Sequence, residues 1–565
     1  MSQRKFMNKA GSKNIFLFLL SIFFQITSNA AITSVQINGL VQQTDNKIVA
    51  SASASVSGVN QIMVMRYNTD GSLDSTFGDN NTGLATVQIG DLSVATAVGI
   101  QSNDNIIATG YTLVGGVPEF VSVAYTPSGI LDTAYGTSGI TTQLIGDGAA
   151  AYGMAIQSDD SIIQVGVAVM SGVPQFGLLR LTSGGVADSS FGTGGVMTTA
   201  IGDFSSAQSV VIQPSNNKII VAGWAFVSGV QEFALVRYNT DGTLDTSFGT
   251  SGIVTTIIGS TASISSVALD SSENIIVGGV SDNTFTVARY DSTGTLDTSF
   301  GTGGIVTTAL GSNDKVVAVL VQSNDKIVAV GNTDSNIAIV RYNTDGTLDT
   351  SFGTGGIVIS ALQDVMQANA GLLQSDEKIL AGGLINANSL IIRYNTNGTY
   401  DLNWGLQGIV SIPGGSYKIL ETLIYDHKTQ GTNGGTFTSG AWRTRDLNVI
   451  IAASSNESLL NNQIILQPGI YAVKGSAIAY GVDSHQVRLR DITDSVTIAY
   501  GSSAVSDSTN PSATASMLET KVFVSKPTVF EIQHQCQTTK ATDGFGLAAN
   551  FGTEIYTTVK IIQES

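Results

Sequence analysis

The sequence predicts an all-β chain in which a seven-bladed β-propeller is followed by a β-sandwich or jelly-roll domain. Three observations lead to this prediction. Glycine is abundant, with 63 of 565 residues, while only 12% of the residues are charged, a composition that favours short strands and tight turns over helices. Two short phrases recur along residues 32–413, which indicates a repeat architecture. A different strand pattern follows from residue 418, as expected for a chain long enough to hold two domains.

Residues 1–30 are expected to be a signal peptide. A basic stretch that includes Arg4 and Lys5 precedes an apolar run at 15–24, and Ser28-Asn29-Ala30 offers small residues for cleavage. The run of about ten residues is too short to cross a bilayer, which takes about twenty. We therefore expect a secreted, extracellular or cell-surface protein that transits the periplasm and keeps no membrane span after cleavage. An uncleaved membrane anchor is the alternative.

The first recurring phrase has the form Leu-Asp-Thr-Ser-Phe-Gly, and its clearest copies lie at 296–301 and 348–353. Its aspartates recur 52 to 58 residues apart, as Asp74, Asp132, Asp188, Asp245, Asp297, Asp349 and Asp401. A second phrase precedes each copy and reads Gln-Ser-Asn-Asp-Lys-Ile-Val at 322–328. Because each phrase occurs seven times, we expect seven structural units.

One unit, residues 315–362, predicts four short strands. We expect these strands at 315–322, 326–331, 336–342 and 356–362. The segment Asn343-Thr344-Asp345-Gly346 between the last two is typical of a tight turn. Four strands in each unit is the pattern of a propeller blade. Because a single unit cannot bury both of its faces, packing around a closed ring is favoured, and an open solenoid is the alternative.

An arginine lies eight residues before nearly every aspartate of the first phrase. The arginines are Arg66, Arg180, Arg237, Arg289, Arg341 and Arg393. We expect each arginine to end the third strand and to form a partly buried, bidentate pair with the aspartate of its own unit, which would hold the crossover in place. The second unit has Ala124 at this position, so Asp132 should be unpaired or bonded differently.

The turn residues admit an alternative interpretation as a calcium site, since Asn343, Asp345 and Asp349 alternate as in a calcium loop. A complete loop needs six or more oxygens and a late bidentate acid, and that acid is missing. Turn chemistry explains the same residues, so we expect no metal and no cofactor. The recurring phenylalanines are expected in the core between units, at Phe77, Phe191, Phe248, Phe300 and Phe352.

The first four units carry a longer connection between their second and third strands than the last three. Corresponding connections of a propeller lie on one face, so these four would form an arc that offers a contact surface. The candidate contact residues in the arc are Asn60, Pro118, Pro174 and Gln231. Drift among tolerant surface hairpins is the alternative.

The thirteen-residue string at 237–249 and 341–353, Arg-Tyr-Asn-Thr-Asp-Gly-Thr-Leu-Asp-Thr-Ser-Phe-Gly, resembles the bacterial delta-60 repeat. The resemblance covers residues 32–413 and recurs in every unit. It implies a propeller-like module of an exported protein with a surface location, and it implies no particular ligand.

Residues 418–565 predict a second β domain, and Pro413-Gly414-Gly415-Ser416 is expected to be the linker. Strands are expected at 418–427, 436–448, 462–480, 486–501, 515–535 and 553–563. Several of these segments are long enough to hold two strands. About eight strands in a domain of this size indicate a sandwich or jelly roll.

The second domain also resembles a known family. The string at 434–448, with Thr-Ser-Gly-Ala-Trp-Arg-Thr-Arg-Asp in it, is similar to the head domain of phage tail and virion structural proteins, as are 485–489, 530–536, 544–546 and 554–556. That resemblance implies a jelly roll that forms a homotrimer and binds a receptor or surface. Phage structural proteins lack secretory signals, so we expect an exported cellular protein.

The histidines and the cysteine all lie in the second domain, as His427, His485, His534 and Cys536. Their absence from residues 32–413 excludes Ser-His-Asp, Cys-His and histidine–metal sites from the propeller, and one cysteine excludes an intrachain disulfide. His485, His534 and Cys536 would suit zinc, although buried histidines and an inert thiol are favoured.

Trp442, Arg443 and Arg445 are further candidate contacts, because an indole stacks on a sugar and a guanidinium pairs with a carboxylate. Packing within the sheets is the alternative for all three residues.

The net charge of −17 argues against nucleic acid as a partner, because phosphate would be repelled. We expect a non-enzymatic binding or adhesion protein with a protein or carbohydrate surface ligand. The propeller would display the contacts, and the second domain would serve for contact or oligomerisation. The alternatives are an exported hydrolase or lyase that uses carboxylates in the propeller channel, and a trimeric spike or fibre subunit.

Overall fold

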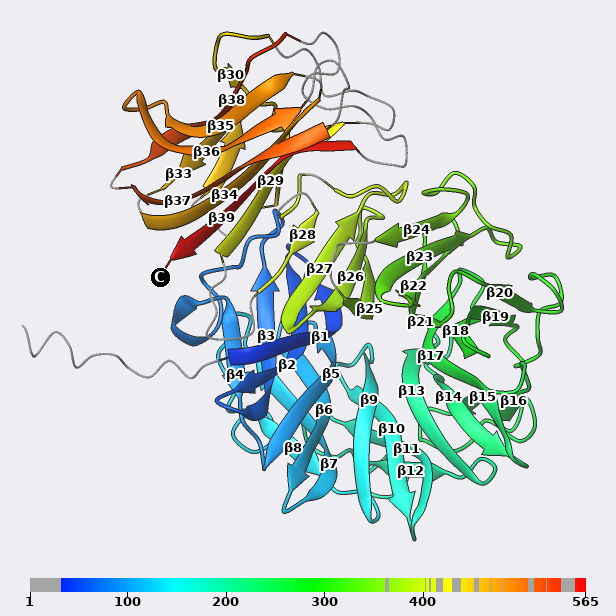
Figure 1. The fold of residues 1–565 in the computed structure, drawn as a ribbon. Coiled ribbons are helices and arrows are strands. Elements are labelled where there is room, and N and C mark those ends of the chain that lie inside the picture. The colour runs from blue at the N-terminus through cyan, green and yellow to red at the C-terminus, as the bar shows by residue number, and fades with distance from the viewer. Residues whose placement is uncertain are drawn as a thin grey trace, which may run out of the picture.

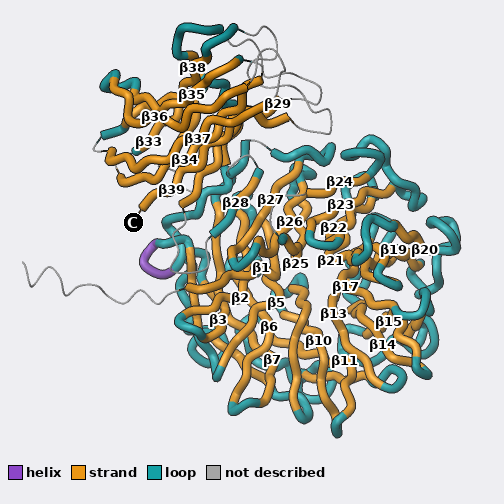
Figure 2. The backbone as a smooth tube through the Cα atoms, viewed as in Figure 1, coloured by secondary structure: helices purple, strands orange, loops and turns teal. Residues whose placement is uncertain are grey.

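The computed structural model describes residues 32–360, 365–401, 403–405, 408–412, 420–428, 438–451, 457–467, 469–480, 482–506, 513–524, 526–539 and 554–564. The expected signal peptide and linker lie outside these residues. Strands form nearly all of the regular structure in the described ranges, where the 3-10 turn η1 (Asp79–Asn81) is the exception (Figure 2). The all-β prediction is confirmed.

Small antiparallel sheets follow one another from residue 32 to residue 410, and Figure 1 shows them arranged around a common centre. Each sheet with its turns is termed a blade. In chain order the blades are β1 (Ile32–Gln42), β2 (Ile48–Val56), β3 (Val59–Tyr67) and β4 (Leu84–Val87); β5 (Leu92–Ile100), β6 (Ile106–Val114), β7 (Val117–Tyr125) and β8 (Ile140–Gln143); β9 (Gly148–Ile156), β10 (Ile162–Met170), β11 (Val173–Leu181) and β12 (Val196–Thr199); β13 (Phe204–Ile212), β14 (Ile219–Val227), β15 (Val230–Tyr238) and β16 (Ile253–Thr256); β17 (Ala262–Leu269), β18 (Ile275–Ser281), β19 (Thr284–Tyr290) and β20 (Ile305–Thr308); β21 (Asp314–Val321), β22 (Ile327–Thr333), β23 (Asn336–Tyr342) and β24 (Ile357–Ser360); β25 (Met366–Leu373), β26 (Ile379–Ile385), β27 (Asn388–Tyr394) and β28 (Ile409–Val410). Strands within a blade are hydrogen-bonded in chain order, except that β9 lies against β10 without a place in the sheet of β10, β11 and β12.

The blade of residues 314–360 shows why these segments become strands. Its second strand, Ile327–Thr333, is buried along nearly its whole length, because neighbouring blades cover both faces of the sheet. A strand covered on both faces reads as a continuous apolar run rather than an alternating one, and the sequence here is Ile-Val-Ala-Val-Gly. The first three predicted strands of this unit match β21, β22 and β23 to within two residues at each end.

Adjacent blades share their apolar side chains. One cluster contains Ile339 and Phe352 from one blade with Ile379 and Ile392 from the next. The five recurring phenylalanines are fully buried, as predicted. The first and last blades share such a cluster too, because Trp404 packs with residues of β1, β2 and β3. The series of sheets therefore returns to its start.

The longer connection predicted in the first four units is a longer hairpin and not a longer loop. β2 and β3 have nine residues each, whereas β18 and β19 have seven each. Both hairpins turn through two residues with positive φ, Ser57-Gly58 in one and Asp282-Asn283 in the other. The additional residues therefore extend the ladder of the hairpin, where their backbone groups are paired.

Residues 420–564 form two further antiparallel sheets, one ordered β31-β29-β39-β34-β37 and one ordered β32-β33-β38-β35-β36, with β30 paired to β38. Their strands are β29 (Leu420–Lys428), β30 (Arg443–Thr444), β31 (Val449–Ile451), β32 (Glu457–Leu460), β33 (Gln463–Leu466), β34 (Gly469–Tyr480), β35 (Asp483–Asp491), β36 (Val496–Ser506), β37 (Ala513–Val524), β38 (Thr528–Cys536) and β39 (Glu554–Glu564). The two sheets share one apolar cluster, to which Tyr471 and Val473 contribute from one sheet and Leu489 and Ile532 from the other.

The expectation of a single strand at 436–448 is wrong for the described part of that segment. Only β30 forms there, as two residues that pair with Gln533 and His534 of β38. The same edge of β38 is already paired with β33 through residues 528–530, which leaves little room for a longer strand. The predicted segments 462–480, 486–501 and 515–535 each correspond to two strands.

Candidate functional site

Each arginine lies beside the aspartate of its own blade. Nε of Arg237 donates to Oδ2 of Asp245 at 2.6 Å, and each side chain is 7% exposed. The same contact joins Arg66 to Asp74, Arg180 to Asp188, Arg289 to Asp297 and Arg341 to Asp349, at 2.7 to 2.8 Å. In the last blade Nη2 of Arg393 lies 2.7 Å from Asp401. Since a single guanidinium nitrogen makes each contact, the expectation of a bidentate pair is wrong.

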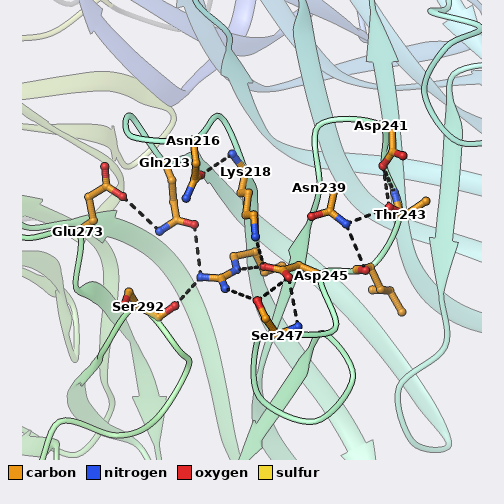
Figure 3. A network of polar contacts seen from close by, with 12 residues as sticks. Gln213, Asn216, Lys218, Asn239, Asp241, Thr243, Asp245, Ser247, Glu273 and Ser292 are labelled. Carbon is orange, nitrogen blue, oxygen red and sulfur yellow. Dashed lines mark hydrogen bonds and ion pairs between the residues drawn. The ribbon is translucent and has the colours of Figure 1, made fainter.

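Other donors occupy the oxygens that a bidentate pair would need. Oδ1 of Asp245 accepts the backbone N–H of Ser247 at 3.2 Å and its hydroxyl at 2.7 Å. Nζ of Lys218 lies 2.7 Å from Oδ2 (Figure 3). Burial opposes the charge of Asp245, but hydrogen bonds from Lys218, Ser247 and Arg237 outweigh it and hold the pKa of the carboxyl well below its ordinary value.

The lysine is a partner that sequence reasoning missed. Four blades place a lysine on the aspartate, with the pairs Lys47–Asp74, Lys218–Asp245, Lys326–Asp349 and Lys378–Asp401. The signal was present, because in these four units the lysine directly precedes the isoleucine that begins the second strand. The structure thus joins the two phrases of a unit at one carboxylate.

Asp132 has a different partner, since its blade lacks the arginine. Nδ2 of Asn105 donates to Oδ2 of Asp132 at 2.9 Å. Asn105 stands where other blades have the lysine, so a neutral amide replaces two cations. The backbone N–H of Ala134 donates to the other oxygen at 3.1 Å, and the turn at this crossover is thereby kept.

The same residues also hold the turn of the next blade. Nη1 of Arg289 donates to the carbonyl of Thr344 in the next blade at 2.5 Å. The same guanidinium lies 4.8 Å above the ring of Phe300. The N–H of Gly301 donates to the carbonyl of Asp345, also in the next blade, at 2.8 Å. The glycine hydrogen bond recurs as Gly78–Ser128, Gly136–Gly184, Gly192–Asp241, Gly249–Thr293, Gly353–Asn397 and Gly405–Asp70. The repeated residues therefore join blade to blade, and the final bond returns to the first blade.

The turn aspartates serve backbone turns and not a calcium loop. Oδ1 of Asp345 accepts the N–H of Thr347 at 2.9 Å and its hydroxyl at 2.7 Å. The carboxylate of Asp349 is held by Arg341 and Lys326 instead. Within the described part of the chain, no group of three or more histidine, cysteine, aspartate or glutamate side chains is placed to hold a metal ion.

A cavity of about 550 Å³ lies where the first strands of the blades converge. It is lined by Gln36, Asn38, Ser53, Asn60, Val94, Thr96, Tyr111, Tyr152, Gln208, Ser265, Lys315, Val317, Asn332, Gln367 and Asn369. These residues come from β1, β5, β9, β13, β17, β21 and β25 and from the strands beside them. The feature is termed the axial cavity.

β-Bulges place one side chain of each of six inner strands, all except β9, in the axial cavity. In β1 the ladder to β2 skips Asn38, and in β21 the ladder to β22 skips Val317. The corresponding skipped residues in four other blades are Thr96, Gln208, Ser265 and Asn369. All six line the cavity. A bulge re-aims a side chain, and here it provides lining residues that differ in type from blade to blade.

Of the four predicted contact residues on the long hairpins, Asn60 lines the axial cavity. The other three, Pro118, Pro174 and Gln231, are half-buried at the starts of β7, β11 and β15 and are not among the lining residues. The hairpin arc and the cavity thus meet at Asn60 only.

The contact candidates in the C-terminal sheets are engaged in packing. Arg445 is buried, and its Nε donates to the hydroxyl of Thr557 at 2.6 Å. Burial lowers the pKa of Arg445 to about 10. The ring of Trp442 lies 4.2 Å below the guanidinium of Arg488. Arg443 is exposed in β30, so it is the one of the three whose side chain faces solvent.

His485 and His534 lie together inside the C-terminal sheets. Nδ1 of His485 is 2.9 Å from Nε2 of His534, and its Nε2 is 2.8 Å from the hydroxyl of Thr514. Burial lowers the pKa of His485 to about 4, and the charge of Arg445 acts in the same direction. Burial also lowers the pKa of His534 and raises that of the Cys536 thiol to about 11. Such a pair of neutral imidazoles satisfies a buried polar position without a metal.

The repeat segment matches a β-propeller family. The family model described as "Domain of unknown function (DUF5122) beta-propeller" matches residues 43–77, 157–191, 215–248, 274–300, 322–352 and 374–403. These stretches each begin near the second recurring phrase and end near the first, so they coincide with six of the seven units recognised in the sequence, all except the second. The β-propeller prediction is confirmed by this match. Among curated proteins, none matches the chain.

Solved structures also resemble parts of the chain. Two structures of Sqt1 from Chaetomium thermophilum are each 11% identical to this chain and align with a TM-score of 0.37. One alignment covers 66% of this chain and 85% of the Sqt1 chain, and the other covers 68% and 89%. A structure of murine APRIL shares 8% identity and a TM-score of 0.18, over 25% of this chain and 98% of its own.

The described residues contain no helix with the length and apolar character that a membrane crossing requires.

Proposed function

We propose that this chain is an exported, non-enzymatic binding or adhesion protein. A closed seven-bladed propeller presents the binding face, and a C-terminal jelly-roll head joins chains into a homotrimer. The observation that carries the proposal is the chemistry of the axial cavity. Its lining residues offer carboxamides, hydroxyls and one ammonium group, and no carboxylate. Such groups bind a ligand by hydrogen bonds but supply no pair of carboxyls for acid–base catalysis at neutral pH.

The closed ring is supported at the junction of the last blade with the first. The N–H of Gly405 donates to the carbonyl of Asp70 at 2.5 Å, as each earlier glycine does to the next blade. Side chains of Asn369 and Gln42 add further hydrogen bonds across this junction. A ring closed in this way leaves only the short outer strand of each blade as an edge and makes a rigid platform.

Export and a cell-surface location are supported by the sequence of residues 1–30, in which basic residues precede a short apolar run and a small-residue site. The resemblance of residues 32–413 to the delta-60 repeat agrees with that location.

The trimer is supported by exposed apolar side chains on two adjacent edge strands. Tyr500 and Val505 of β36 are 58% and 64% exposed, and Met517 and Phe523 of β37 are 57% and 75% exposed. β36 and β37 each end the order of their sheet and lie against one another. Large apolar side chains gathered at an edge mark a contact surface. The resemblance of this domain to phage head domains, which implies a homotrimer, favours further copies of the chain as its occupant.

Size-exclusion chromatography with light scattering on the mature chain tests the head. We expect a trimer for the natural sequence and a monomer for the double variant Met517→Ser, Phe523→Ser. The matched control is Leu460→Ser, which replaces a 60% exposed leucine on β32 and should remain trimeric. A monomeric natural chain at micromolar concentration would refute the oligomerisation role.

A second assay separates binding from catalysis. The mature chain is incubated with polysaccharides, and new reducing ends or unsaturated products are measured. We expect none, whereas products that form in proportion to enzyme concentration would make the chain a hydrolase or lyase.

A further inference from the structure

Several lining groups of the axial cavity are held in place by the blades. Nδ2 of Asn38 donates to the carbonyl of Ala95 at 2.7 Å, across to the next blade. The carboxamide of Asn332 donates to the carbonyl of Ala368 at 2.9 Å and accepts its N–H at 2.7 Å. These hydrogen bonds fix the carboxamides, so the cavity is a preformed site.

Other polar groups in the cavity have no hydrogen-bond partner among the described residues. They are Gln36, Tyr111, Tyr152, Lys315 and Gln367. They come from the first, second, third, sixth and last blades. Polar groups that point to one centre from several elements, with their hydrogen-bonding capacity unused, are what a ligand with several hydroxyls requires.

Lys315 is the one charged side chain among the lining residues. Partial desolvation by the surrounding strands lowers its pKa, while the residue itself remains exposed to solvent. The neighbouring Asp314 points to the other face of β21, where its carboxylate accepts the N–H groups of Leu310 and Gly311 at 2.7 and 3.0 Å. An ammonium without a protein counter-ion among the described residues favours an anionic group on the ligand.

Two aromatic rings, those of Tyr111 and Tyr152, line the cavity. Tyr111 pairs with Val94, one residue before the bulge of β5. A half-buried aromatic ring offers a flat apolar surface, and the C–H face of a sugar is suited to it.

We propose that the axial cavity binds a saccharide that carries a carboxylate, with Lys315 on the carboxylate, Gln36 and Gln367 on hydroxyls, and Tyr111 and Tyr152 against the sugar faces. The cavity volume of about 550 Å³ lies in the range of about 300–1,000 Å³ that small-molecule sites have. One ammonium in a chain of net charge −17 suits a ligand with a single acidic group and not a polyanion such as nucleic acid. This inference rests on the proposed binding function and names its ligand class.

A glycan array that displays neutral and carboxylated oligosaccharides tests the inference, with the mature chain as the probe. We expect binding to glycans that bear sialic or uronic acids and not to their neutral counterparts. Lys315→Met should weaken binding by roughly tenfold or more, as loss of a charge-assisted hydrogen bond does. Gln367→Leu should weaken binding and keep the preference for acidic glycans. The matched control is Lys526→Met, an exposed lysine of the C-terminal sheets, which should bind as the natural chain does.

Three results would overturn the inference: no binding to any carboxylated glycan, equal binding to acidic and neutral glycans, or unchanged binding by Lys315→Met. Melting temperatures of the variants show that each is folded. Failure of this inference can be distinguished from failure of the proposed function, because a trimeric, non-catalytic chain that binds no carboxylated glycan would overturn the ligand class alone. A chain that binds and cleaves the glycan would instead overturn the non-enzymatic assignment.

Discussion

Replacing Asp245 by asparagine tests the role of the repeated carboxylates most directly. The side chain of Asp245 is 7% exposed and faces both Arg237 and Lys218. Asparagine has nearly the same shape and keeps an acceptor for Ser247, but it removes the charge. Arg237, itself 7% exposed, would then be a buried cation without its partner. We expect the propeller to lose stability for this reason.

The size of the loss follows from burial. Breaking a buried ion pair costs about 3–5 kcal/mol, and the lower end applies here because Lys218 is 27% exposed and can be hydrated again. Unfolding entropy is about 2 cal/mol/K per residue, which for roughly 380 residues gives about 0.8 kcal/mol/K. A loss of about 3 kcal/mol therefore lowers the melting temperature by about 4 °C.

Differential scanning calorimetry at pH 7 measures this shift. The control is Asp241→Asn in the same blade, whose carboxylate accepts hydrogen bonds from Thr243 in an exposed turn. Asp297→Asn is an intermediate case, since Asp297 is 24% exposed and pairs with Arg289 alone, and we expect about 1 °C there. Equal shifts for Asp245→Asn and Asp241→Asn would refute the argument that burial of the pair sets its contribution.

Three further predictions follow from the same contacts. Gly346→Ala should destabilise the propeller more than Gly355→Ala does. Both glycines have positive φ, but only at Gly346 would a Cβ atom lie 2.8 Å from a backbone atom of the preceding blade. Equal melting temperatures of the two variants would contradict this. Asp132→Asn should lower the melting temperature by less than about 1 °C, since Asn105 is its neutral partner. The C-terminal sheets should lose stability as the pH falls from about 6.5 towards 4. The pKa of His485 is about 4 in the folded chain, so the unfolded chain takes up the proton at higher pH than the folded chain does. The variant His485→Gln should weaken this pH dependence of stability in a calorimetric pH series.

The propeller could be predicted because its repeat is a set of local rules that each unit obeys. Tight turns, apolar strands and the constant spacing of Asp245 and its equivalents all indicate the same architecture. The single-nitrogen contact of the arginine could not be predicted, since it depends on the other donors to the carboxylate, Ser247 and Lys218. A pairwise spacing such as arginine and aspartate eight apart carries no information about a third partner.

The axial cavity could not be predicted from the sequence for a different reason. Its lining residues are selected by β-bulges, which shift the register within β1, β5 and the other inner strands. A shift of one residue exchanges the two faces of a strand, so a side chain such as Gln208 could not be assigned to the cavity without the ladder. Likewise the sequence left both a contact role and packing open for Arg445, and the structure buries it.

The repeats also separate residues that build the scaffold from residues that are free to differ. At the crossover every blade must meet the next in the same way, so arginine, aspartate, glycine and an aromatic ring recur there. At the axis the side chains line a cavity, and only some of them, such as Asn38 and Asn369, also bond a neighbouring blade, so the repeat of the scaffold sets a weaker requirement there. The lining residues at that position accordingly differ in nearly every blade, namely Asn38, Thr96, Tyr152, Gln208, Ser265, Val317 and Asn369. A ligand without rotational symmetry needs such a lining, since identical groups around the axis would bind it equally well in every orientation. The variation at the axis is therefore the feature that the proposed site would use for specificity.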